Sequence, residues 1–254
     1  MNDPLETLDW QGKELDCSVC EDASLLADGV CKPRHACVHD RYARRIDRFF
    51  SRHPDLAKQY IAHPYFEVRA VASKYVDVFK LSGMRNDADE TVRSMVVLRL
   101  PQRQLLEMRN DPEREVRIRV ASKLTGQDLE PMMHDADYYV RTVVARRLPK
   151  GMLALMINDP DSSVRAMVVK RVDENLLQTM CSDPEAGVRL TIARRLPVHL
   201  LPLLLQDRDW RVRYEVARRI AADHLSLMTQ DEDSMVQEMA LLRQRETRAM
   251  KQQR

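Results

Sequence analysis

The stretch NDPDSSVRAMVVKRVDENLLQTM, residues 158–180, decides the fold because its pattern recurs along most of the chain. Its Val-Arg dipeptide returns every 24 residues, and the last occurrence reads Val-Gln. The repeat valines are Val68, Val92, Val116, Val140, Val164, Val188, Val212 and Val236. A fixed period without insertions predicts units that each bury too little surface alone and therefore stack on one another.

Each repeat carries the signals of one α-helix. Five residues before the valine stands an aspartate, Asp159 in the quoted stretch, followed by Pro160 and then Asp161. We expect Asp159 to be the N-cap, Pro160 the first helical residue and Asp161 a carboxylate of the first turn. From Val164, apolar residues follow four, five and eight positions later, which is typical of a helix buried on one face.

The rest of each repeat holds a leucine and, three residues later, usually a methionine, as at Leu177 and Met180. A spacing of three favours a short helical segment of the 3₁₀ type. A second full α-helix does not fit, since tetratricopeptide and HEAT repeats need longer periods for two. The fold class predicted is all-α: a solenoid of repeats with one α-helix and one short 3₁₀-like helix each.

The repeat unit resembles the leucine-rich repeat variant family in its period and in its Asp-Pro-Asp and Val-Arg positions, over roughly residues 60–240. This resemblance implies a right-handed solenoid of alternating α- and 3₁₀-helices without a β-sheet. We expect about eight repeats in residues 51–254, preceded by a small cysteine-rich domain in residues 1–50. Eight aromatic residues between positions 42 and 79 are predicted to join these two parts.

The chain has no apolar run of about 20 residues and no basic and apolar leader at its N-terminus. We therefore expect a cytoplasmic protein without a membrane partner. In a reducing compartment, clustered cysteines are metal ligands more often than disulfides.

Four cysteines lie within 21 residues, with the spacing C-x2-C-x10-C-x5-C: Cys17, Cys20, Cys31 and Cys37. Four thiolates so close together predict a metal site. Spacing alone leaves zinc and an iron–sulfur cluster equally open, because only Cys17 and Cys20 form a tight pair. Nearby, His35 and His39 are interpreted as surface residues or as residues that support the ligands.

The resemblance decides between these metals. Some members of the repeat-variant family carry an N-terminal module that binds a [4Fe-4S] cluster, and the four cysteines match it. It implies that Cys17, Cys20, Cys31 and Cys37 are all ligands of a [4Fe-4S] cluster, with zinc as the alternative. The fifth cysteine, Cys181, occupies a position that is apolar in other repeats and is expected to be a core thiol.

Formal charges nearly cancel, at +2 overall, but two basic columns recur with the repeat. The first follows the valine directly: Arg69, Arg93, Arg117, Arg141, Arg165, Arg189 and Arg213. The second comes seven residues after the valine: Arg99, Lys123, Arg147, Arg171, Arg195, Arg219 and Arg243. The first column lies among the apolar positions of the helix, so we expect its arginines to be partly buried and paired with the repeat aspartates, possibly across the repeat boundary.

No glycine-rich phosphate loop, nucleophile elbow or convincing catalytic set is present, so we expect no enzyme. The function predicted is an iron–sulfur repeat protein that acts as a scaffold for an unidentified protein partner, with redox sensing or electron transfer to a redox partner. The alternative is a nucleic-acid binder that uses an arginine column and the basic tail LLRQRETRAMKQQR, residues 241–254, with a structural metal site.

Overall fold

The computed structural model describes residues 7–252, and in this range it contains helices, turns and three isolated β-bridges but no strand. The contacts divide the chain into two compact units, Met1–Leu124 and Thr125–Arg254, here called unit 1 and unit 2. This division falls between two repeats. The boundary expected at residues 50 and 51, between a cysteine-rich domain and the repeats, stays a prediction.

Unit 1 begins with α1 (Ala23–Ala27), α2 (Ala43–Arg52) and the 3₁₀-helix η1 (Pro54–Gln59). Its repeats then form α3 (Phe66–Ala72), α4 (Val78–Met84), α5 (Glu90–Val97), α6 (Gln102–Leu105), η2 (Leu106–Met108) and α7 (Arg114–Lys123). The helices α2, α3, α5 and α7 pack in that order, each against the next.

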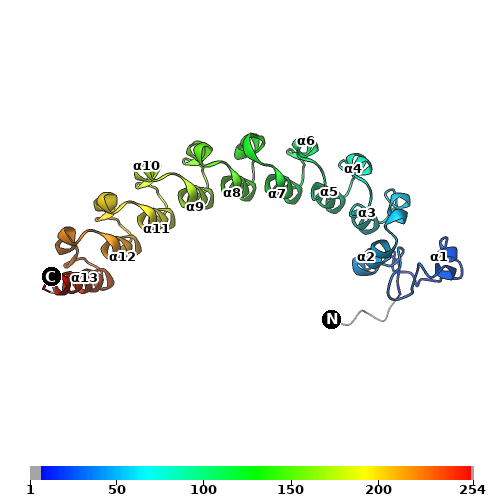
Figure 1. Cartoon of the computed structure of the whole chain (residues 1–254), viewed down its shortest axis with the longest axis horizontal. Coiled ribbons are helices and arrows are strands. Elements are labelled where there is room, and N and C mark those ends of the chain that lie inside the picture. Colours follow the sequence, from blue (N-terminus) through cyan, green and yellow to red (C-terminus); the bar gives the residue numbers. More distant parts are fainter. Residues whose placement is uncertain (1–6, 253–254) are drawn as a thin grey trace. The chain divides into compact units, whose positions relative to one another are not determined.

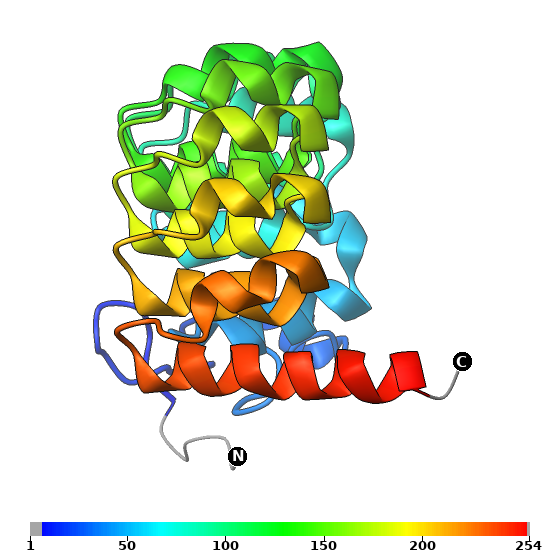
Figure 2. The same ribbon diagram turned by 90° about the vertical axis from the view of Figure 1, so that its left-hand side faces the viewer.

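Unit 2 contains five longer helices: α8 (Tyr138–Arg147), α9 (Ser162–Arg171), α11 (Ala186–Arg195), α12 (Trp210–Arg219) and α13 (Ser234–Gln252). The short segments between them are η3 (Gly126–His134), η4 (Lys150–Met156), α10 (Glu174–Leu177), η5 (Gln178–Met180), η6 (Val198–Leu204) and η7 (Ala222–Met228). Within unit 2 the longer helices form one row and the short segments a second row (Figure 1). The final helix, α13, extends past its neighbours at its C-terminal end (Figure 2).

The all-α fold class is confirmed, and so is the short helical segment: it is purely 3₁₀ in η3, η4, η6 and η7, begins as an α-turn in α6 and α10, and is wholly α-helical in α4. The expected helix start is wrong by two residues. In the quoted repeat α9 begins at Ser162, and Asp161 is the N-cap that accepts a hydrogen bond from the backbone N–H of Ser163 at 2.8 Å. The earlier Asp159 is not the cap because its carboxylate pairs with an arginine of the preceding repeat.

The core is aliphatic and is built from the repeat positions. The valines of the repeat are at most 1% exposed, from Val68 through Val236, and so are the leucines of the short segments, from Leu81 through Leu225. Each methionine three residues after such a leucine is also buried, as at Met108 and Met180. Both helices of a repeat thus face the same apolar layer, which explains why the two spacings occur together in every unit.

Aromatic residues join the N-terminal segment to the first repeat within unit 1. Phe49 and Phe50 of α2 are fully buried and pack edge-on against Tyr60, with ring centroids 6.0 and 5.6 Å away. Trp10 stacks on Tyr65 with centroids 5.8 Å apart. The predicted aromatic junction is confirmed for these residues, whereas Phe79 of α4 is 91% exposed and lies outside it. Among residues 7–252, no helix has both the length and the apolar character that crossing a bilayer requires.

Candidate metal centre and basic columns

The first two cysteines flank a tight turn. The Asp16 carboxylate accepts hydrogen bonds from the backbone N–H and the hydroxyl of Ser18, at 2.8 and 2.6 Å, and so closes the loop between Cys17 and Cys20. The short helix α1 follows, anchored by the Ala23 N–H, which donates to the Cys20 carbonyl at 3.0 Å. Sequence and local hydrogen bonding therefore hold this pair of thiols at one end of α1.

The third cysteine follows the other end of α1. The helix is terminated by Gly29, whose φ of 73° lies in the left-handed region that favours glycine. The chain then turns back, and the backbone N–H of Cys31 donates to the carbonyl of Leu25 at 3.1 Å. This turn returns Cys31 toward the helix that carries Cys20 at its start.

The fourth cysteine is held by a closed set of contacts. Its backbone N–H donates to the carbonyl of Arg45 at 3.3 Å. The Arg45 guanidinium, fully buried, donates through Nη1 to Oδ2 of the equally buried Asp40 at 2.7 Å. Asp40 in turn accepts from the backbone N–H of Tyr42 at 2.9 Å. The start of α2 and the loop of Cys37 are thus fixed to one another by a buried ion pair.

The thiols of Cys17, Cys20, Cys31 and Cys37 are half-buried, and all are free thiols. Burial, with smaller contributions from the nearby charges of Cys20, Asp22 and Cys17, raises the pKa of Cys31 to about 11. Burial also raises the pKa of Cys37 to about 12, with a contribution from Cys31. Cys17 and Cys20 thus lie within electrostatic range of Cys31, and Cys31 within range of Cys37; that all four cysteines bind one cluster stays a prediction.

The donor set fits an iron–sulfur cluster. A backbone hydrogen bond from Asp22 to the Cys20 sulfur, and others from His39 and Asp40 to the Cys37 sulfur, lower the pKa of these two thiols against the effect of burial. Hydrogen bonds to the sulfurs are a feature by which proteins tune such clusters. Four partly buried thiols with these donors also satisfy the ligand count of a zinc site.

Beside the cysteines lies a polar cluster that sequence reasoning did not assign. The His39 Nε2 lies 2.7 Å from Oδ2 of Asp22 and 3.8 Å from Oε1 of Glu21. The hydroxyl of Tyr60, from the first repeat, donates to the same Asp22 oxygen at 2.8 Å. The signal was present, since Glu21 and Asp22 directly follow Cys20 and His39 comes two residues after Cys37. This cluster ties the cysteine region to the repeat region within unit 1.

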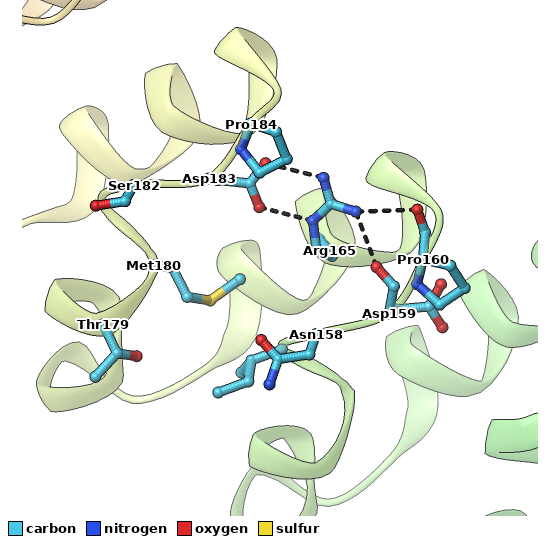
Figure 3. Close-up of a pocket in the computed structure, with 10 residues that line it drawn as sticks. Asn158, Asp159, Pro160, Arg165, Thr179, Met180, Ser182, Asp183 and Pro184 are labelled. Atoms are coloured by element: carbon cyan, nitrogen blue, oxygen red, sulfur yellow. Dashed lines mark hydrogen bonds and ion pairs between the residues drawn. The ribbon is translucent and has the colours of Figure 1, made fainter.

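The first basic column crosses the repeat boundary, as expected. In Figure 3, Arg165 donates from Nε and Nη2 to both carboxylate oxygens of Asp183 in the next repeat, at 2.6 and 2.9 Å. Its Nη1 donates to the carbonyls of Asp159 and Pro160 in its own repeat. The same bidentate pair, always 18 residues apart, forms at Arg69–Asp87, Arg93–Asp111, Arg141–Asp159, Arg189–Asp207 and Arg213–Asp231.

These pairs are substantially buried, with side-chain exposures of 10% for Arg165 and 4% for Asp183. Burial alone would raise the pKa of Asp183, but hydrogen bonds from Arg165 and from the backbone N–H of Glu185 outweigh it and hold this pKa below its usual range. The hydrogen bonds that Arg165 donates to Asp183 raise the pKa of Arg165. Both groups are therefore charged at neutral pH and neutralise each other.

The second basic column also has a structural partner. Arg99 donates to the carbonyls of Ser73 and Val76 at the end of the preceding repeat's helix, at 2.8 and 2.6 Å. Arg243 makes the equivalent pair of bonds to Ala217 and Ile220, at 3.0 and 2.6 Å. Lys123, Arg171, Arg195 and Arg219 likewise donate to carbonyls of the preceding repeat. These cations satisfy carbonyls that a helix C-terminus leaves open.

Cys181 lies far from the other cysteines in sequence and is half-buried. Its Sγ lies 3.6 Å from the carbonyl of Leu177, and burial raises the pKa of this thiol. A raised pKa reduces the thiolate fraction, so this cysteine has the character of a packed, unreactive thiol.

Stacked helical repeats joined by ion pairs, preceded by a segment with four half-buried cysteines, define a class of α-helical repeat protein with a cysteine-rich N-terminal segment. Residues 7–59 match the family described as "LRV protein FeS4 cluster". A solved structure, described as a leucine-rich repeat variant with a novel repetitive structural motif, superposes with a TM-score of 0.84 at 42% identity, covering 89% of this chain and 97% of that one. The chain belongs to the leucine-rich repeat variant family and carries an LRV FeS4 cluster domain.

A relative from Rhodobacter capsulatus is described as an uncharacterized 27.7 kDa protein in the nifB 3' region. It is 47% identical over 96 residues, which is 38% of this chain and 39% of the relative. The match therefore spans well under two thirds of that relative.

Proposed function

We propose that this protein is a non-enzymatic iron–sulfur scaffold of the cytoplasm. Its N-terminal segment holds a [4Fe-4S] cluster on Cys17, Cys20, Cys31 and Cys37, and its repeats present a surface to a protein partner. The observation that carries the proposal is the set of four half-buried thiols with backbone donors at Cys20 and Cys37, inside the match to the FeS4 family.

The residues around the thiols have separable tasks in this proposal. Cys37 is fixed by the Arg45 carbonyl, while the backbone N–H groups of His39 and Asp40 point hydrogen bonds at its sulfur. The Asp40–Arg45 pair, fully buried, keeps water away from this ligand. One-electron exchange is the chemistry that a [4Fe-4S] cluster supplies when bound, and its potential responds to such hydrogen bonds and to burial.

A redox role is supported by the position of the cysteines. All four thiols keep partial exposure, and Val19 between the first two is 80% exposed. A cluster held there would lie within reach of a docked redox partner. The scaffold role is supported by the repeats, because stacked units offer long binding surfaces.

Metal analysis after anaerobic purification tests the cofactor. We expect about four iron and about four sulfide per chain, with a broad brown absorbance and an electron paramagnetic resonance signal after reduction. About one zinc per chain in a colourless preparation would contradict the assignment and leave a structural metal site.

Partner capture tests the function separately. The loaded protein is immobilised without oxygen, either oxidised or reduced with dithionite, and bound proteins are quantified against a protein of similar charge. A specific partner retained in one or both states supports the scaffold, and a difference between the states supports redox sensing. Absence of any specific partner in both states contradicts the scaffold.

Nucleic-acid binding through the second basic column is the weaker proposal. The described members of that column donate to backbone carbonyls of neighbouring repeats, as Arg99 and Arg243 do. Affinity for an oligonucleotide that falls steeply with salt would favour it nonetheless.

A further inference from the structure

One surface of unit 2 carries cations that neither basic column explains. Six residues after the repeat valine, four consecutive repeats place an exposed cation: Arg146, Lys170, Arg194 and Arg218, here called the basic row. These residues lie near the C-terminal ends of α8, α9, α11 and α12, which pack in that order. The basic row therefore crosses four neighbouring helices.

Little on these helices neutralises the basic row. The helices α8, α9 and α11 contain no aspartate or glutamate, and α12 contains only Glu215. Glu215 forms an ion pair with Arg218 at 2.7 Å. In the part of the chain that the structure describes, no carboxylate lies within ion-pair distance of Arg146, Lys170 or Arg194. The cap aspartates lie at the opposite ends of the helices, about 12 Å away along the axis.

The repeat does not need a cation at this position in order to fold. In unit 1 the equivalent positions hold Lys74, Leu98 and Ser122. Leu98 is the C-cap of α5, and Ser122 lies one residue before Lys123, the last residue of α7, so neither helix needs a cation at this particular position. The four successive cations of unit 2 thus point to a purpose beyond the repeat itself.

Next to the basic row lies a strip of uncharged side chains. The Arg218–Glu215 pair shows that side chains three residues apart on one helix meet on this surface. The corresponding neighbours of the other cations are uncharged: Val143, Met167 and Thr191, with the half-buried Leu190 beside the last. A ligand lying along the basic row would meet apolar contacts at Met167 and Leu190, which are half-buried, whereas Val143 is buried.

The geometry points to an extended acidic segment of a partner protein as the occupant. Packed helices lie 8–10 Å apart, and three residues of an extended chain in the polyproline-II conformation span about 9 Å and return the side chain to the same side. A carboxylate at every third position would therefore meet one cation per repeat, and apolar residues beside it would meet the strip. This inference rests on the proposed scaffold function and names the surface and the chemical class of its partner.

A nucleic acid fits the same surface less well. Its bases would need aromatic platforms beside the cations. The exposed aromatic residues of these helices, Tyr138, Tyr139 and Trp210, lie at the N-terminal ends, beside the cap aspartates. Cations and aromatic rings are thus separated by most of the length of a helix.

Fluorescence anisotropy with the full, cluster-loaded chain tests the inference. The probe is a labelled 12-residue peptide with glutamate at every third position and leucine after each glutamate. The triple variant Arg146→Gln, Lys170→Gln and Arg194→Gln is compared with a control that removes the same charge elsewhere, Lys150→Gln, Arg245→Gln and Arg248→Gln. All six side chains are exposed, so both triples should keep the wild-type melting temperature.

We expect salt-sensitive binding that weakens about tenfold or more in the first triple, since each exposed charge contact contributes up to about fivefold. The control should change affinity less than about twofold, and a glutamine version of the peptide should not bind. The inference is overturned if the peptide does not bind, or if both triple variants lose peptide affinity equally. It is also overturned if a 12-nucleotide oligo-dT binds the wild-type chain more tightly than the peptide does and the first triple variant loses that binding. If a partner from the capture experiment still binds the first triple variant, the proposed scaffold function stands, but the basic row is not its binding surface.

Discussion

Two ion pairs in unit 2 show how burial decides the energetic value of a charge. Arg165 and Asp183 are 10% and 4% exposed, whereas Arg211 and Asp209 are 56% and 17% exposed, although both pairs are closer than 3 Å. Removing one partner of a buried pair leaves a charge without compensation, and removing a partner in water does not. An arginine–aspartate pair of nearly the same length therefore contributes differently to the free energy of unfolding, depending on its burial.

Arg165→Gln should lower the free energy of unfolding by about 3 kcal/mol, because it strands the Asp183 carboxylate between two repeats. Urea denaturation followed by circular dichroism measures this. Arg211→Gln is the matched control and should leave the urea midpoint unchanged. Equal shifts in the two variants would show that burial does not distinguish them.

Cys37→Ser should abolish retention of iron, because it removes the most constrained of the four thiols. Cys181→Ser should retain the wild-type iron content, because that thiol packs within a repeat. Iron and sulfide analysis of both purified variants makes the comparison. Loss of iron from Cys181→Ser would overturn this assignment.

At the scale of the element, the helix starts differ in how their caps work. Asp161 accepts a hydrogen bond from the Ser163 N–H at the start of α9, whereas Glu185 at the start of α11 has no side-chain cap bond. A capping carboxylate satisfies a backbone donor that the helix leaves open. Equivalent positions in the repeat thus have unequal importance.

Asp161→Ala should destabilise the protein by about 1 kcal/mol, which is the usual cost of losing an N-cap. Glu185→Ala should cost clearly less. Thermal unfolding of the two variants decides between them, and a larger effect for Glu185→Ala would show that the cap bond is not the source of the stability.

Most elements could be predicted from the sequence because the same spacing of apolar residues, ambiguous in one unit, recurs in every repeat. The 24-residue period, the α-helix and the 3₁₀ segment were predictable from the spacing of Val164, Leu177 and Met180. The helix start was not, because an aspartate near a helix can cap it or pair with an arginine, and spacing does not separate these uses. Asp159 makes the pair and Asp161 makes the cap.

The candidate site was predictable in its residues but not in its surroundings. The four cysteines follow from composition and spacing, whereas the support of Cys37 by Arg45 and the contact of Tyr60 with Asp22 join residues that are separated in the chain. Contacts of this kind depend on the path of the backbone. The carbonyl partners of the second basic column were missed for the same reason.

At the scale of the whole molecule, the carboxylates of the repeated ion pairs make the free energy of unfolding depend on pH. The pKa values of Asp87, Asp183 and Asp231 lie below the usual range because arginine and backbone donors outweigh burial. A depressed pKa in the folded state contributes stability above the unfolded value, which is about 3.9, and this contribution is lost as the pH falls through the folded value.

We therefore expect the urea midpoint to be independent of these carboxylates above about pH 5 and to fall steeply below about pH 4. Urea titrations at half-unit steps of pH test this. Asp183→Asn, which has one fewer titrating group, should show a lower midpoint at pH 7 and a shallower fall in acid. A wild-type midpoint that stays level down to about pH 2 would contradict the role of the pairs.

The constant separation of 18 residues between each arginine and its aspartate also constrains how this protein can evolve. An insertion of one residue between Arg165 and Asp183 would lengthen the separation of this pair alone, and would break its two hydrogen bonds or force a bulge at a buried boundary. Duplication of one whole 24-residue repeat, here called a cassette, would instead add an arginine and an aspartate and keep the separation of 18 residues in every pair. Lineages of this protein should therefore differ in length by whole cassettes, and their genes by multiples of 72 nucleotides.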